Sequence, residues 1–138
     1  REAGDRRGSR VKVLALDYGS ARTGVAVSDT TGTLARPLGI VEQVGTDAGL
    51  ERLLDLVRAE EPERVVVGLP LTLQGEVGEQ AQETERFIES LSRALTVPVE
   101  PFDERFTTTL AGPGGDDDAR AAAHLLTSYL EWSKNRQP

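Results

Sequence analysis

The spacing of apolar residues changes several times along this 138-residue chain, and each change predicts a new element. Apolar and β-branched runs at Val11–Leu16 and Thr23–Ser28, separated by a polar turn, predict an antiparallel hairpin. A third strand is expected near Leu38–Val44, after a break at Arg36-Pro37. The chain therefore begins with three strands that are close in sequence.

Three later stretches show the helical period, with apolar residues three and four positions apart. The first stretch should end before Pro62, because proline disfavours helical geometry in the residue before it. Thr46 or Asp47 is placed to cap its amino end. Its apolar stripe consists of Leu50, Leu53, Leu54 and Val57. The other two helices are expected at Glu79–Leu95 and Ala119–Trp132.

Two more strands lie between these helices. Arg64–Leu69 is too short for a helix and too apolar for an edge, which predicts a central strand covered on both faces. Val97–Phe102 contains two prolines, which favour a sheet edge. The order of elements predicts an α/β fold with a mixed five-stranded sheet, an antiparallel hairpin unit plus parallel strands, and helices on both faces.

Length and composition add limits to this picture. We expect one domain over 11–133, a disordered basic tail at 1–10 and a polar tail at 134–138. No apolar run approaches the ~20 residues that a membrane span needs, so we expect a cytoplasmic protein without membrane contact. The chain has no cysteine, and any metal must therefore be held by oxygen.

The net charge of −7 argues against an unspecific nucleic-acid binder, because phosphate affinity depends mostly on lysine and arginine. Much of the negative charge falls on the first two predicted helices, while residues 1–12 are basic. The acidity therefore weakens the case for a nucleic-acid partner without removing it.

Three carboxylates in distant segments are candidates for one metal site. Asp17 ends the first strand, Glu104 follows the last strand, and Asp118 opens the last helix on the same stripe as Ala122 and Leu125. Each has a simpler interpretation: a turn residue for Asp17, a surface ion pair with Arg105 for Glu104, and a helix cap for Asp118. A bound cation would explain why Asp118 faces a core.

Other candidates concern the substrate. Arg22 and Arg105 can clamp a phosphate by bidentate donation, although solvated surface arginines are an equal alternative. Gly75 and Gly78, before the second helix, can let backbone N–H groups approach a phosphate, or they are flexible loop glycines. His124, the single histidine, lies off the apolar stripe and is expected to be structural.

Four ordered blocks of this sequence resemble the YqgF/RuvX family. They are Leu14–Gly19 with Arg22, Gly24 and Val25–Asp29, Val67–Pro70 with Gly75, Gly78 and Ala81, Asp103-Glu104-Arg105 with Thr107-Thr108, and Asp118 with the apolar positions that follow it. The chain departs from the family in one place: only Thr109 to Asp117 fills a stretch that members usually have longer and basic.

The resemblance implies a ribonuclease-H-like fold and a nuclease, acting either on Holliday junctions or on the 5′ end of precursor 16S rRNA. It also implies that Asp17, Glu104 and Asp118 are the catalytic acids. Such a triad would hold one or two Mg²⁺ or Mn²⁺ ions that activate water and stabilise the leaving oxygen. A resolvase would be expected to work as a homodimer, whereas a processing nuclease need not.

Two alternatives compete with the nuclease. The same fold can serve as a non-catalytic RNA-binding ribosome assembly factor, and metal-dependent cleavage would separate the two. Asp17-Tyr18-Gly19-Ser20 also echoes the phosphate loop of actin-like and sugar-kinase domains. Those proteins need two such domains around a cleft, and this chain has room for one.

Overall fold

The computed structural model of the protein describes residues 12–106 and 118–135, except for the side chains of Phe106, Asp118 and Asn135. The predicted tail at 1–10 and the short Thr109 to Asp117 segment lie outside these ranges. The strands are β1 (Val13–Asp17), β2 (Arg22–Ser28), β3 (Ala35–Glu42), β4 (Arg64–Leu69) and β5 (Val99–Asp103). The helices are α1 (Asp47–Glu60), α2 (Glu79–Ala94), α3 (Asp118–Asn135) and the short 3-10 turn η3 (Glu104–Phe106).

The five strands form one mixed sheet in the order β3-β2-β1-β4-β5. β1, β2 and β3 pair antiparallel, whereas β1, β4 and β5 are parallel to one another. This confirms the predicted hairpin unit plus parallel strands, with β4 in the interior and β5 at an edge. Because β1, β4 and β5 run in the same direction, their carboxyl ends meet at one end of the sheet.

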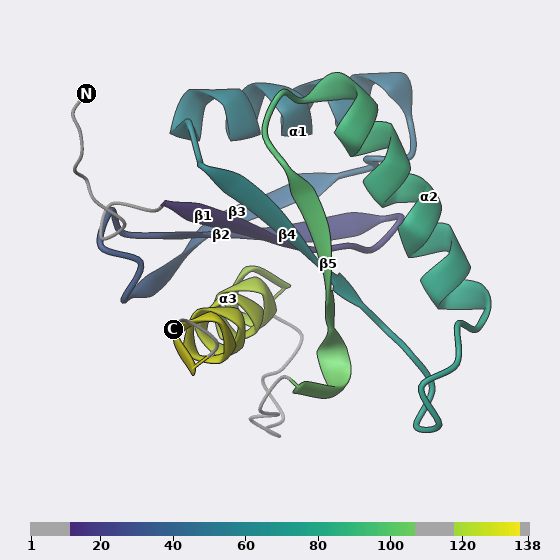
Figure 1. The fold of residues 1–138 in the computed structure, drawn as a ribbon. Helices are drawn as coiled ribbons and strands as arrows, with labels where there is room; N and C mark the ends of the chain where they lie inside the picture. Colours follow the sequence, from purple (N-terminus) through teal and green to yellow (C-terminus); the bar gives the residue numbers. More distant parts are fainter. Residues whose placement is uncertain (1–11, 107–117, 136–138) are drawn as a thin grey trace.

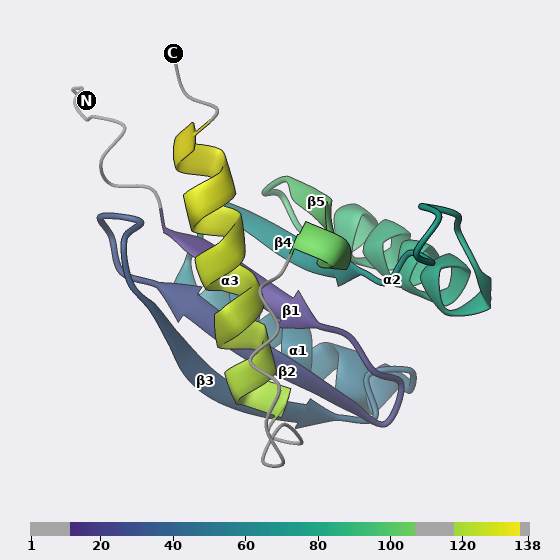
Figure 2. The same ribbon diagram turned by 90° about the horizontal axis from the view of Figure 1, so that it is seen from below.

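Helices cover both faces of the sheet, as predicted. α1 and α2 lie on one face and α3 crosses the other (Figures 1 and 2). Side chains alternate along β1, so Leu14 and Leu16 join the core under α1 and α2, and Val13 and Ala15 join the core under α3. None of the described helices has the length and apolar character that a membrane crossing requires.

α1 follows its predicted capping. The Thr46 hydroxyl accepts a hydrogen bond from the N–H of Gly49 at 3.0 Å, and the helix ends at Glu60, before Pro62. The Glu61 C-cap takes the left-handed conformation at φ 51°.

Two predicted boundaries were wrong. β3 begins at Ala35 and contains Pro37, which was expected to break the strand. β3 is an edge strand, and its pairing with β2 is irregular at this point, so proline's missing N–H costs little. α3 continues to Asn135, so the first two residues of the predicted polar tail are helical.

Candidate active site

Asp17 is the last residue of β1 and lies at the carboxyl end of the parallel strands. It has the same parity as Val13 and Ala15 and therefore faces the α3 side. On β2, Asp17 pairs with Gly24. On β4, the neighbouring residue is Gly68, because Leu16 pairs with Val67 and both strands run in the same direction. Neither neighbour has a side chain, which leaves space around the Asp17 carboxylate.

Glu104 enters this space from the other direction. It is the first residue of η3, directly after β5, and its side chain lies over Gly68. A Cβ atom on Gly68 would meet Glu104 Oε2 at 2.5 Å and Leu125 Cδ2 at 3.1 Å. A side chain at position 68 would therefore displace the Glu104 carboxylate from this position.

Electrostatics show that the two acids interact. Burial first, and then the negative charges of Asp17 and Asp103, raise the pKa of Glu104 from its ordinary 4.5 to about 7. Burial and the charge of Asp17 both disfavour the ionised form of Glu104. A cation between them would remove this penalty, and oxygen donors are what Mg²⁺ and Mn²⁺ prefer.

The third predicted acid is Asp118. Asp118 begins α3, and its side chain lies outside the described residues. Among the side chains that the structure describes, no three His, Cys, Asp or Glu residues form a group suited to a metal ion. Asp17 and Glu104 thus form a pair, and a triad with Asp118 stays a prediction.

Arg105 does not pair with Glu104, so the simpler interpretation of Glu104 as a surface ion pair was wrong. Its guanidinium binds the Asp103 carboxylate instead, with Nη2 at 2.7 Å from Oδ2 and Nε within 3.1 Å of both oxygens. Hydrogen bonding from Arg105 lowers the pKa of Asp103. Asp103 and Glu104 are adjacent in sequence, yet one acid is neutralised by an arginine and the other is turned inward toward Asp17.

The remaining candidates lie near the same end of the sheet. Arg22 begins β2 and is exposed. Gly75 has a φ of +84°, and its N–H donates to the Thr72 carbonyl inside the β4–α2 loop at 2.8 Å. Gly78 is the N-cap of α2. Phosphate contacts by these residues and by Arg105 stay predictions, and His124 is half-buried on α3.

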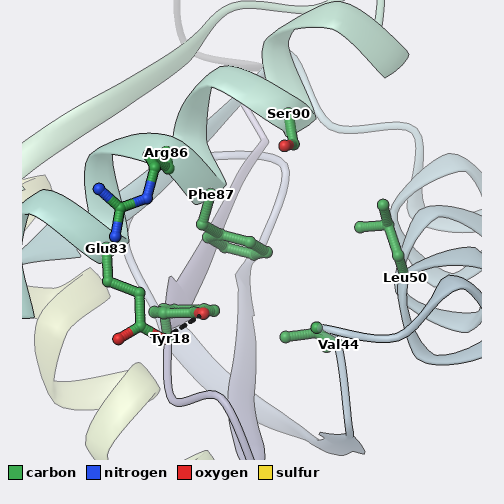
Figure 3. Close-up of a pocket in the computed structure, with 8 residues that line it drawn as sticks. Tyr18, Val44, Leu50, Glu83, Arg86, Phe87 and Ser90 are labelled. Atoms are coloured by element: carbon green, nitrogen blue, oxygen red, sulfur yellow. Dashed lines mark hydrogen bonds between the residues drawn. The ribbon is translucent and has the colours of Figure 1, made fainter.

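Tyr18 has a role that sequence reasoning missed. Its ring stacks on Phe87 of α2 at a centroid distance of 4.3 Å, and its hydroxyl donates to Glu83 Oε2 at 2.9 Å (Figure 3). Burial and the hydrogen bond to Glu83 raise the pKa of Tyr18 to about 12. Tyr18, the residue after Asp17, therefore connects the end of β1 to α2. It lines a pocket of about 240 Å³ on the face opposite α3. Tyr18 and Phe87 are 69 positions apart, so no local sequence pattern predicts this contact.

The strand order and the helix placement define the class of protein, an α/β domain of the ribonuclease-H-like fold. Among solved structures, Thermus thermophilus RuvC in complex with a Holliday junction substrate matches 91% of this chain and 97% of that chain. The TM-score is 0.58 and the sequence identity 17%, a likeness of fold alone. The fold that the family resemblance implied is thus confirmed.

The family follows from the sequence matches. The family model for RuvX, described as Holliday junction resolvase, matches residues 11–132. A Chloroflexus aurantiacus protein is 46% identical over 99 residues, which cover 72% of this chain and 65% of the relative. A Chloroflexus aggregans protein is 42% identical over 135 residues, covering 89% of this chain and 95% of the relative. Both relatives are named "Putative pre-16S rRNA nuclease". The chain belongs to the RuvX family.

Proposed function

We propose that this chain is a metal-dependent endonuclease that hydrolyses phosphodiesters in structured nucleic acid, with precursor 16S rRNA as its first candidate substrate. The names of its relatives support this substrate. One structural observation carries the proposal: Glu104 is held over Gly68, half-buried, beside the negative charge of Asp17. Burial and the neighbouring charge disfavour the ionised form of Glu104, and a bound cation would favour it.

One or two Mg²⁺ or Mn²⁺ ions fit the donors present. Asp17 and Glu104 would hold the metal from two strands' ends, and Asp118, at the start of α3, is the proposed third ligand. When bound, such an ion activates water and stabilises the leaving oxygen of the phosphodiester. The chain's own part would be to hold both carboxylates near one point, with Gly68 leaving room for Glu104, and the charge of a bound ion would favour the ionised form of Glu104.

The other predicted residues complete the proposal. Arg22 is proposed to contact a phosphate at the rim of the site, and Arg105 to do so with the N–H groups that bind neither Asp103 nor the Leu73 carbonyl. Gly75 and Gly78 would bring the β4–α2 loop close to the substrate backbone. A cytoplasmic location and, for a junction substrate, a homodimer belong to the same proposal.

A four-way DNA junction is the second candidate substrate, because the matching family model is described as a Holliday junction resolvase. The non-catalytic assembly factor is less favoured. An RNA-binding role alone gives no reason to hold two acids together, since carboxylates repel the phosphates that such a factor must bind.

The test compares both substrates side by side. Precursor 16S rRNA and a four-way DNA junction are incubated with the protein in Mg²⁺, in Mn²⁺ or in EDTA. We expect cleavage of one substrate that requires metal and is lost in Asp17→Asn while the circular dichroism spectrum is unchanged. Cleavage by Asp17→Asn at the wild-type rate, or in EDTA, would refute the proposed site.

A further inference from the structure

Leu73 lies at the tip of the β4–α2 loop, residues 70–78, and its side chain is 89% exposed. Among the large apolar side chains that the structure describes, it is the most exposed, and Val77 of the same loop is 42% exposed. Single exposed apolar residues are common on protein surfaces. The construction and the position of this loop distinguish Leu73 from such residues.

Hydrogen bonds within the loop hold it in a defined turn. The N–H of Thr72 donates to the Glu76 carbonyl at 3.0 Å, and the Thr72 hydroxyl accepts from the N–H of Glu76 at 3.0 Å. The N–H of Gly75 donates back to the Thr72 carbonyl at 2.8 Å, with the left-handed φ of +84° that glycine permits. Leu73 lies between these bonded residues, so the turn holds its backbone in place and directs the side chain to solvent.

The loop is also attached to the candidate active site. Arg105 Nη1 donates to the Leu73 carbonyl at 3.4 Å, and the same guanidinium packs on Gly75, where a Cβ would lie 3.2 Å from Nη1. Asp103 holds the guanidinium from the other side. Arg105 directly follows Glu104 in η3, and η3 and the loop both extend beyond the carboxyl ends of β5 and β4 (Figure 1). Leu73 is therefore attached through Arg105 to the short 3-10 turn that carries Glu104.

We propose that Leu73 is a wedge that enters an unstacked base step of the substrate beside the phosphate to be cut. This inference rests on the proposed nuclease function. An apolar side chain exposed beside a phosphodiester-cutting site gains by leaving water, and a base step at a branch or unpaired position costs least to open. The net charge of −7 leaves little phosphate attraction, so apolar contact with bases supplies affinity that the charge does not.

The experiment uses the full chain in an Asp17→Asn background, which binds without cutting. The precursor rRNA and the four-way junction each carry 2-aminopurine at the unpaired or branch step, where unstacking raises fluorescence. We expect binding to raise the fluorescence of one substrate severalfold, Leu73→Ser to abolish the rise, and Leu73→Phe to retain it.

Leu34 provides the matched control, because it is 69% exposed in the β2–β3 turn, at the opposite end of the sheet. Leu34→Ser should keep the full fluorescence rise. In the otherwise wild-type chain, Leu73→Ser should lower kcat/KM about tenfold, the size expected for losing one wedge contact, and Leu34→Ser should not change it.

Three outcomes overturn the wedge: a full rise with Leu73→Ser, equal losses for the two serine variants, or no rise with any variant. The same experiments distinguish a failure of the wedge from a failure of the proposed nuclease function. Wild-type cleavage without a fluorescence rise refutes the wedge alone. A rise that depends on Leu73, without metal-dependent cleavage by the wild type, supports the wedge and refutes the nuclease.

Discussion

Asp29 and Glu104 lie at opposite ends of the same sheet and in opposite environments. Asp29 follows β2 and closes the turn to β3: its Oδ1 accepts from the N–H groups of Thr33 and Leu34, at 2.9 and 3.2 Å, and its Oδ2 accepts from the Thr31 hydroxyl. These hydrogen bonds lower the pKa of Asp29. Glu104 is instead half-buried beside Asp17, and burial first and neighbouring charge second raise its pKa to about 7.

The difference separates a carboxylate that serves the fold from one that serves a site. Donors surround Asp29, so its ionised form is stabilised and the turn is held. The surroundings of Glu104 disfavour its ionised form. Its carboxylate occupies the space that a side chain at position 68 would fill. Acids in such surroundings are typical of functional sites. The predictions below test this contrast.

The largest effect is expected from Glu104→Gln. Losing a metal ligand removes several kcal/mol of transition-state stabilisation, so single-turnover cleavage should fall by roughly 10³-fold while the fold is retained. Asp29→Asn is the matched control and should leave the cleavage rate unchanged while lowering Tm slightly. Equal effects of the two variants on cleavage would show that Glu104 has no special role in the reaction.

Gly68→Ala should have the next largest effect. The new methyl group would meet the Glu104 carboxylate and Leu125, so Glu104 must move, and a displacement of about 1 Å can cost about 10²-fold in rate. Gly45→Ala is the control, since a Cβ there has no atom within 4 Å. Cleavage rates and urea unfolding of both variants check this. A fully active Gly68→Ala protein would show that the Glu104 position is not needed.

The ionisation of Glu104 should make the stability of the folded protein depend on pH. Its pKa in the folded protein is about 7 against an ordinary 4.5, so its contribution to stability is complete below pH 4.5 and is lost as the pH rises through about 7. In EDTA, the urea midpoint of the wild type should therefore fall from pH 5 to pH 8 by more than that of Glu104→Gln.

Addition of Mg²⁺ should reverse this fall above pH 7, because the metal binds the ionised carboxylate. The same urea titrations, repeated in excess Mg²⁺, measure the effect. Identical pH profiles for wild type and Glu104→Gln would contradict the buried position of Glu104.

The smallest effect is expected from Arg105→Lys. Lysine cannot reproduce the two-pronged contact with Asp103 and also reach Leu73, so the β4–α2 loop should loosen. Hydrogen exchange of the Gly75 amide should become faster, with little change in Tm. Arg93→Lys is the control, because its pair with Glu89 is exposed and 3.8 Å long. An unchanged Gly75 exchange rate would mean that Arg105 does not hold the loop.

Local pattern was sufficient for most of the fold. The period of apolar residues predicted the five strands and the three α-helices, together with the Thr46 cap and the interior position of β4, but not the 3-10 turn η3. The two errors, Pro37 inside β3 and the longer α3, lie where strand pairing or the end of a helix outweighs local preference.

The sequence by itself determined that acids end β1, follow β5 and begin α3, and family resemblance assigned them a shared function. Tertiary structure alone decided that the charge of Asp17 acts on Glu104, that Glu104 turns inward while Arg105 pairs with Asp103, and that Tyr18 stacks on Phe87. The physical reason is that these contacts depend on the register of parallel strands joined through helices. No spacing along the chain records that register.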